Sequence, residues 1–176
     1  MAGRVKTLYL LRHAKSAHDD PANADFDRPL TARGRRDARR MAAYMNASGR
    51  VPDTVICSLA RRAVETWEHM APLLAHPLTP RFEFDLYLAP SDVMLAFIRR
   101  LPETAASALV IGHNPGIAEI TAELATGGEN DALEAMRKAF PTCALAALTF
   151  DVDRWSAIDA RDGYLAAFLS AADLAG

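Results

Sequence analysis

The sequence contains little cysteine and no long hydrophobic run. Only two cysteines, Cys57 and Cys143, occur in 176 residues, and they lie far apart within apolar segments. Because this pattern fits neither a disulfide framework nor a zinc-binding spacing, we expect two buried thiols. No apolar run approaches the roughly 20 residues that a membrane-spanning helix needs. The N-terminal residues also lack the long apolar core of a signal peptide, so we expect a cytoplasmic protein without membrane contacts.

An excess of charge of one sign is also missing. The formal net charge is −2, with 24% charged and 51% hydrophobic residues. Such a balance produces no global field that would attract nucleic acid or acidic membranes, so we expect no nucleic-acid partner. The length and apolar fraction are typical of one globular domain, spanning residues 1–176, with a sizeable core.

Strand-like and helix-like segments alternate along most of the chain. Runs rich in β-branched and apolar residues predict strands at residues 7–11, 54–58, 81–88 and 107–113. Helical spacing and start signals, with Thr31 and Ser91 as N-caps and Pro115 near a first position, predict helices at residues 32–46, 60–74, 91–101 and 114–124. Alternation of this kind predicts an α/β fold, with a mainly parallel sheet covered by helices on both faces.

The C-terminal third of the chain is less regular. A loop is expected over residues 126–131, followed by a short helix near 133–139. Residues 143–150 and 154–160 are interpreted as two late strands that pair antiparallel. The last segment, from residue 163 onward, fits either a short helix or a tail packed on the core.

Polar residues directly follow several of the predicted strands. They are Arg12 and His13 after the first strand, Ser58, Arg61 and Arg62 after the second, and His113 after the fourth. In an open α/β sheet, ligands bind beyond the carboxyl ends of the strands. We therefore expect two histidines and several arginines to converge on one edge of the sheet.

These residue types suit phosphoryl transfer. The planar arginine fork matches pairs of phosphate oxygens and stays charged at any relevant pH. A neutral imidazole can attack phosphorus and hold the phosphoryl group covalently, and neighbouring arginines would keep it unprotonated. A second imidazole can donate a hydrogen bond to the transferring oxygens. Because phosphoryl transfer depends mainly on positioning and charge stabilisation, this set suffices without a metal or cofactor.

Each signal has a simpler interpretation when taken alone. A single histidine at a strand end is commonly a structural hydrogen-bonding residue, and an arginine pair on a helix is commonly solvated. His18, His69 and His76 show no partner pattern and are interpreted as surface or packing residues. The adjacent residues 18–20 could hold a metal, but neighbours in a loop are weak evidence for ligands. The coincidence of His13 and His113 with nearby arginines favours a site.

Four segments resemble the signatures of a known family. "LYLLRHAKS", "DRPLTARGRRDA", "CSLARRAVET" and "LVIGHNPGI" occur in the order typical of the histidine phosphatase superfamily, the phosphoglycerate-mutase-like proteins, between residues 7 and 117. The short chain and the "RHAKS", "DRPL" and "GHNPG" segments are most similar to the SixA-like phosphohistidine phosphatases. The resemblance implies the three-layer α/β/α fold of that superfamily.

The resemblance also implies roles for individual residues. His13 would carry a phosphohistidine intermediate, and Arg12, Arg62 and His113 would form the phosphate pocket. Arg28 of the "DRPL" segment is an additional candidate for substrate binding. Arg61 does not match the motif position and is expected at the surface.

The general acid of larger family members has no clear counterpart here. Asp85 is available in the corresponding region, and Asp92 is explained as part of a helix start. A missing acid points to a substrate with an easily departing group, such as the P–N bond of phosphohistidine.

Three functions remain open from the sequence. The first is a phosphatase acting on a phosphorylated protein, namely a histidine-containing phosphocarrier or phosphotransfer domain. The second is a phosphatase of a small phosphate ester, and the third is a phosphate-binding module without turnover. The loop over residues 15–28 is long enough to face a substrate.

Overall fold

The structure is a computed structural model that describes residues 5–18 and 21–175. Its strands are β1 (Lys6–Arg12), β2 (Thr54–Ser58), β3 (Arg81–Glu83), β4 (Ser107–Gly112), β5 (Ala125–Gly128), β6 (Leu145–Phe150) and β7 (Gly163–Leu169). Its α-helices are α1 (Ala32–Ala47), α2 (Arg61–Met70), α3 (Ser91–Ile98), α4 (Gly116–Leu124) and α5 (Asn130–Lys138). No helix within the described ranges is long and apolar enough to cross a membrane.

All these strands belong to one sheet with the order β3-β2-β4-β1-β6-β7-β5. The central strand β1 pairs parallel with β4 and antiparallel with β6. The pairs β2·β3, β2·β4 and β5·β7 are also parallel, whereas β6·β7 is antiparallel. The sheet is therefore mainly parallel, as the alternating pattern predicts.

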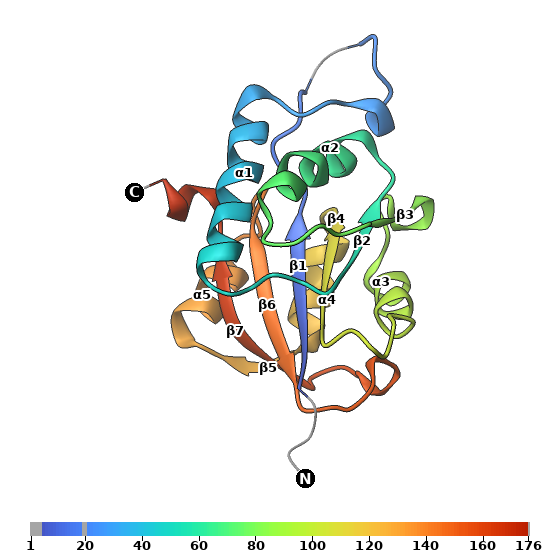
Figure 1. Cartoon of the computed structure of the whole chain (residues 1–176), viewed down its shortest axis with the longest axis vertical. Helices are drawn as coiled ribbons and strands as arrows, with labels where there is room; N and C mark the ends of the chain where they lie inside the picture. Colours follow the sequence, from blue (N-terminus) through green and yellow to red (C-terminus); the bar gives the residue numbers. More distant parts are fainter. Residues whose placement is uncertain (1–4, 19–20, 176) are drawn as a thin grey trace.

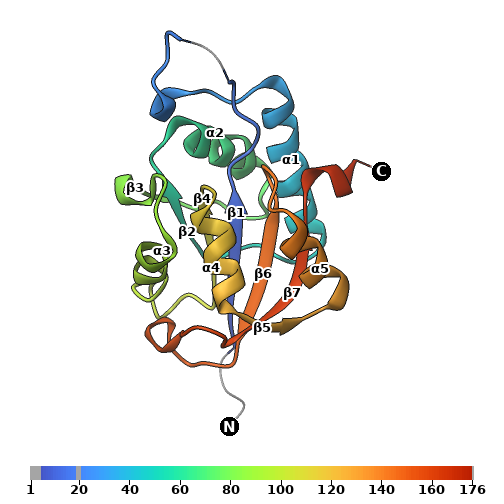
Figure 2. The same ribbon diagram turned by 180° about the vertical axis from the view of Figure 1, so that it is seen from behind.

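Helices cover both faces of this sheet (Figures 1 and 2). Along β1, Leu8 and Leu10 pack into the core beneath α3, α4 and α5, whereas Tyr9 and Leu11 pack into the core beneath α1 and α2. Side chains alternate across a strand, so a strand covered on both sides must be apolar at every position. This explains the continuous apolar run at the start of the chain, and it confirms the predicted three-layer α/β/α fold.

The predicted late strand at residues 154–160 is wrong. The segment contains a 3₁₀ turn, Trp155–Ala157, whose indole is fully buried and donates from Nε1 to the Ala105 carbonyl at 2.9 Å. The seventh strand is instead β7, within the C-terminal segment that fits either a short helix or a tail by sequence. β7 completes the antiparallel pair with β6. Burial of one aromatic side chain therefore outweighs the strand-like composition around it.

Other segments also differ from the expectation. The predicted loop 126–131 overlaps the strand β5, which pairs with β7 despite the low strand propensity of its two glycines. The predicted strand 81–88 ends early, because β3 passes directly into a 3₁₀ turn at Phe84–Leu86. The N-cap of α3 is Pro90; Ser91 is its first helical residue, and its hydroxyl donates to Glu123 at 2.7 Å.

Candidate active site

The carboxyl ends of β1, β2 and β4 bring the two histidines together. β1 and β4 are parallel neighbours with Arg12 opposite Gly112, so the residues that follow them, His13 and His113, are adjacent. Their ring centroids lie 5.1 Å apart. On the far side of β4, Ser58 at the end of β2 places its Oγ 2.7 Å from His113 Nε2. The expected convergence at one sheet edge is therefore present, at the upper end of the sheet in Figure 1.

The hydrogen bonds of His13 determine which ring nitrogen is unprotonated. Its Nδ1 lies 2.8 Å from the Ala14 carbonyl. Because a carbonyl only accepts, Nδ1 carries the proton and Nε2 keeps its lone pair. Arg62 Nε donates to that Nε2 at 3.3 Å. The imidazole therefore presents its unprotonated nitrogen to the arginine that would bind a phosphoryl oxygen.

Burial keeps His13 neutral. The side chain is only 6% exposed, and its pKa is well below the ordinary value of 6.5. Desolvation is the largest cause, and His113, Arg62 and Arg12 lower the pKa further, while the bond to Ala14 partly opposes them. An imidazole that remains unprotonated at neutral pH is suited to nucleophilic attack.

One buried and one partly buried arginine make the site positive. Arg62, in the first turn of α2, is 2% exposed, and Arg12, at the end of β1, donates from one terminal nitrogen to the Phe140 carbonyl at 3.0 Å. The pKa of Arg12 is lowered by burial first and then by Arg62. The charge of Arg62 beside Arg12 therefore favours an anionic ligand between the two guanidinium groups.

Unpartnered buried atoms indicate where such an anion would bind. Among the described residues, three buried side-chain polar atoms lack a hydrogen-bond partner: Arg12 Nε, His113 Nδ1 and Asn114 Oδ1. All three belong to residues at the carboxyl ends of β1 and β4. A buried unpaired donor costs roughly 1–3 kcal/mol, so native proteins seldom keep one without use. The Arg12 and His113 nitrogens fit a phosphoryl group as donors.

His113 is neutral as well. Burial, followed by the charge of Arg62, lowers its pKa to about 3. The Ser58 hydroxyl accepts from the Ala60 amide at 3.3 Å, so its own proton is free for His113 Nε2. In that arrangement Nδ1 carries the His113 proton and becomes the donor without a partner. A neutral His113 can therefore donate a hydrogen bond to a phosphoryl oxygen, but it is a poor proton source at neutral pH.

Thr66, the last residue of the "CSLARRAVET" segment, supports the backbone next to His13. Thr66 Oγ1 accepts from the Ala14 amide at 3.0 Å and donates to the Arg62 carbonyl at 2.6 Å. This one side chain ties the residue after His13 to the helix turn that carries Arg62.

Gly34 and Thr31 position α1 against the same loop. Thr31 caps α1 as predicted, since its hydroxyl accepts from the Gly34 amide, and it also donates to the Lys15 carbonyl at 3.1 Å. A Cβ on Gly34 would lie 2.1 Å from the Lys15 oxygen. Only glycine permits this approach, so Gly34 is required by packing, beyond its tolerance in a first helical turn.

Arg28 lies at the rim of the site. Its guanidinium donates to Ser16 Oγ at 2.7 Å, to the Ala17 carbonyl at 2.8 Å and to Asp25 Oδ1 at 3.0 Å. It is close enough to His113 to lower the pKa of that imidazole. Arg28 therefore reaches the pocket through Asp25, while its other donors hold the loop.

Asp25 is a residue that the sequence argument missed. It lies in the 3₁₀ turn Asp25–Asp27, where its main-chain oxygen accepts from Arg62 at 2.6 Å and its Oδ2 accepts from Arg62 at 3.1 Å. The Tyr87 hydroxyl also donates to Oδ2. These bonds, that of Tyr87 foremost, lower the pKa of Asp25 to about 2. The only available signal was its place three residues before Arg28, in the loop expected to be functional.

Tyr87 is the second missed residue. Its ring packs edge-on against His113 with centroids 5.6 Å apart, and the Arg62 guanidinium carbon lies 5.6 Å from its ring centre. Phe26 packs edge-on against it at 5.0 Å. Tyr87 follows the 3₁₀ turn Phe84–Leu86, which the sequence pattern assigns to a strand, so nothing local pointed to its role.

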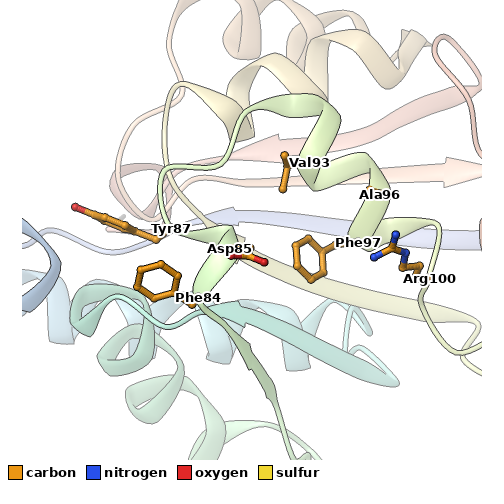
Figure 3. Close-up of a pocket in the computed structure, with 7 residues that line it drawn as sticks. All are labelled: Phe84, Asp85, Tyr87, Val93, Ala96, Phe97 and Arg100. Atoms are coloured by element: carbon orange, nitrogen blue, oxygen red, sulfur yellow. The ribbon is translucent and has the colours of Figure 1, made fainter.

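Asp85 lies apart from the histidines. It is exposed and lines a neighbouring pocket of about 460 Å³ together with Phe84, Tyr87, Val93, Ala96, Phe97 and Arg100. Figure 3 shows Asp85 pointing toward Phe97, whereas Tyr87 extends in the opposite direction. Within the described residues, no hydrogen bond or ion pair joins Asp85 to the pocket around His13. The carboxylate that contacts Arg62 is that of Asp25.

Two other sequence interpretations concern Arg61 and the residues 18–20. Arg61 is exposed and paired with Glu65 at 2.6 Å, as expected for a residue outside the motif. Of residues 18–20, considered for a metal, Asp19 and Asp20 lie outside the described residues.

Comparisons with known proteins agree with this geometry. The profile of the histidine phosphatase superfamily (branch 1) matches residues 8–85. The phosphohistidine phosphatase SixA of Escherichia coli K12 is 32% identical over 147 residues, which cover 82% of this chain and 85% of that protein. The chain therefore belongs to the histidine phosphatase superfamily, which supports phosphatase activity.

Solved structures show the same relationship. A protein from Agrobacterium tumefaciens assigned as phosphohistidine phosphatase SixA superposes with a TM-score of 0.76 at 29% identity, covering 94% of this chain and 98% of that one. The protein histidine phosphatase SixA complexed with tungstate superposes with a TM-score of 0.77 at 26% identity, covering 96% and 99%. The chain is thus similar to SixA in both sequence and fold.

Proposed function

We propose that this protein hydrolyses phosphohistidine on a protein substrate through a phosphohistidine intermediate on His13. The observation that carries the proposal is the unprotonated Nε2 of a neutral His13, which accepts from Arg62 and lies beside the unpaired donors of Arg12 and His113. A phosphoryl group placed there would receive hydrogen bonds from both arginines and from His113.

The proposed reaction has two displacements. His13 Nε2 attacks phosphorus while the bond from phosphorus to the substrate nitrogen breaks, and the departing imidazole takes a proton from solvent. Water then attacks phospho-His13, the P–N bond to Nε2 breaks, and inorganic phosphate and a proton are released. The arginines stabilise the charge of the equatorial oxygens in both steps.

The nature of the nearby carboxylates supports a phosphoramidate substrate. An alkoxide leaving group needs a proton donor, and larger family members are expected to supply one. Here the carboxylate at the pocket is Asp25, whose pKa of about 2 keeps it ionised at neutral pH. Because His113 is also a weak acid, the site favours groups that depart without an enzymatic proton. Phosphohistidine meets that condition.

The proposed partner is a phosphorylated histidine-containing phosphocarrier or phosphotransfer domain. A macromolecular substrate requires an accessible approach to the pocket, and the exposed fractions of Phe84 (62%) and Leu88 (49%) give this rim an apolar surface. A small phosphate ester is the second candidate. The 460 Å³ pocket beside Tyr87, partly lined by Val93 and Phe97, is large enough to receive the apolar part of such a molecule.

A substrate panel tests the proposal. Release of phosphate is measured from a phosphohistidine peptide, a phosphohistidine carrier protein and simple sugar phosphates. We expect much faster turnover of the phosphohistidine substrates, and faster turnover of a sugar monophosphate contradicts the proposal. Tight phosphate or tungstate binding without turnover of any substrate would favour a binding module.

A trapping experiment tests the intermediate. Rapid quenching with radiolabelled substrate should yield acid-labile phosphate on the wild-type protein and none on His13→Ala, with turnover lowered at least about 1,000-fold. His76→Ala removes an exposed imidazole and is the matched control. Activity retained in His13→Ala contradicts the mechanism.

A further inference from the structure

Asp25 places a half-exposed carboxylate at the mouth of the phosphate site. Its Oδ1 is bound by Arg28, and its Oδ2 is bound by Arg62 and the Tyr87 hydroxyl. The Asp25 side chain is 51% exposed, whereas that of Arg62 is 2% exposed. One guanidinium group therefore spans from the buried nucleophile, which its Nε contacts, to this exposed carboxylate.

The substrate must pass close to that carboxylate. His13, Arg62 and His113 are each at most 6% exposed, so the phosphoryl group binds at the buried end of the site. In-line transfer places the leaving group on the side of phosphorus opposite His13 Nε2. That side leads outward, and the anion that the described contacts place there is Asp25.

The net charge of the residues around the site equals, with opposite sign, the charge of one phosphoryl dianion. Arg12, Arg28 and Arg62 contribute three positive charges, Asp25 contributes one negative charge, and burial keeps both histidines neutral. The resulting two positive charges match one phosphoryl dianion. A second anionic group on the substrate would face Asp25 without compensation, whereas a cationic group would be attracted to it.

We propose that Asp25 is a specificity-determining residue that selects substrates by the charge next to the phosphoryl group. Carriers that are neutral or cationic beside the phosphate are accepted, and carriers with a second anionic group are rejected. The inference rests on the proposed phosphatase function and extends it, since a phosphohistidine ring that is protonated on its second nitrogen is cationic beside Asp25. Its low pKa keeps Asp25 charged throughout the pH range of such a reaction.

A series of three phosphate esters tests the inference directly. O-phosphoethanolamine, glycerol 3-phosphate and 3-phosphoglycerate are similar in size and carry a cationic, neutral or anionic group beside the phosphate. Calorimetric titration at about pH 7.5 should give wild-type affinities in that order, with roughly tenfold in Kd between successive ligands at low salt. The differences should shrink in about 0.5 M salt.

Three variants identify Asp25 as the cause. Asp25→Asn should reduce the spread among the three ligands to within about threefold, chiefly by tighter binding of 3-phosphoglycerate. Asp25→Glu keeps the charge and should keep the order. Asp27→Asn removes the same charge from an exposed neighbour on the same turn and should leave the affinities as they are. If Asp25→Asn does not fold, the wild-type and Asp25→Glu series still decide.

Distinct outcomes overturn the inference. Equal tightening of all three ligands in Asp25→Asn would mean that Asp25 only competes with phosphate for the arginines. Equal weakening would mean that it only positions them, and a wild-type series without charge preference also contradicts the inference. Failure to hydrolyse phosphohistidine is a separate result that rejects the proposed substrate, while the ligand series still reports on Asp25.

Discussion

At the scale of single residues, Arg62 connects His13 with Asp25 at the mouth of the pocket. Its Nε donates to His13, and its two terminal nitrogens donate to the main-chain and side-chain oxygens of Asp25. Only a planar guanidinium can serve these directions at once, which explains why a buried site uses arginine rather than lysine here.

Replacing Arg62 by lysine should therefore impair catalysis although the charge is kept. We expect Arg62→Lys to lower kcat/KM for a phosphohistidine peptide roughly 100-fold, since an ammonium group cannot make the bidentate contact of a guanidinium with a phosphoryl group. The adjacent Arg61→Lys is the matched control, because Arg61 is exposed and paired with Glu65. Comparable losses in the two variants would contradict the assignment of Arg62 to the pocket.

Asp85 allows a test of the alternative proton donor. Because its carboxylate points toward Phe97 in Figure 3 and lines the neighbouring pocket, we expect Asp85→Asn to change kcat on phosphohistidine by less than about twofold. Steady-state kinetics on a phosphohistidine peptide and on p-nitrophenyl phosphate would measure this. A loss of more than about tenfold, in kcat rather than KM, would restore Asp85 as a general acid.

At the scale of elements, the start of α1 and the first turn of α2 act as supports for the loop after β1. Thr31 and Gly34 hold α1 against the Lys15 carbonyl, while Thr66 of α2 holds the Ala14 amide. His13, the proposed nucleophile, is thus fixed by a buried strand on one side and by two helices on the other. Such support is what keeps a catalytic side chain within the small tolerance that its geometry requires.

Adding one methyl group at Gly34 should disturb this support. Its Cβ would lie 2.1 Å from the Lys15 oxygen, so we expect Gly34→Ala to lower the free energy of unfolding by about 1 to 3 kcal/mol. Urea denaturation would measure the loss, and a lower kcat would accompany it. Gly127→Ala, at an open position in β5, is the control. Equal stability of Gly34→Ala and wild type would show that α1 does not depend on this close approach.

At the scale of the whole molecule, burying two neutral histidines makes stability depend on pH. The pKa of His113 is about 3, and that of His13 is well below the ordinary 6.5, with burial as the largest cause for both. Between pH 6.5 and the folded-state values, the unfolded chain binds protons that the folded protein does not. Stability from these groups is therefore complete above pH 6.5 and declines as the pH falls through this window.

We expect this decline in urea unfolding from about pH 8 to pH 4.5. His113→Gln removes one of the two groups and should reduce the slope of the unfolding free energy below pH 6.5. His76→Gln, which removes an exposed imidazole, is the control. An equal slope in His113→Gln and wild type would mean that His113 does not resist protonation in the folded protein.

The sequence by itself determined the strands that end on Arg12 and His13 and on His113, the helix capped by Thr31, and the α/β class. These features follow from local periodicity and from caps, which depend on residues close together in the chain. The same order placed Arg62 after a neighbouring strand, so the central part of the site could be predicted.

Only the tertiary structure decided which residues complete the site and where the last strands lie. Asp25 meets Arg62 across 37 positions and Tyr87 across 62, and no local pattern encodes such a contact. β5 and β7 become strands because each pairs with a distant neighbour, while Trp155 leaves the sheet to fill the core. Long-range pairing and burial outweigh intrinsic propensity at these positions, and for that reason the sequence alone assigned them differently.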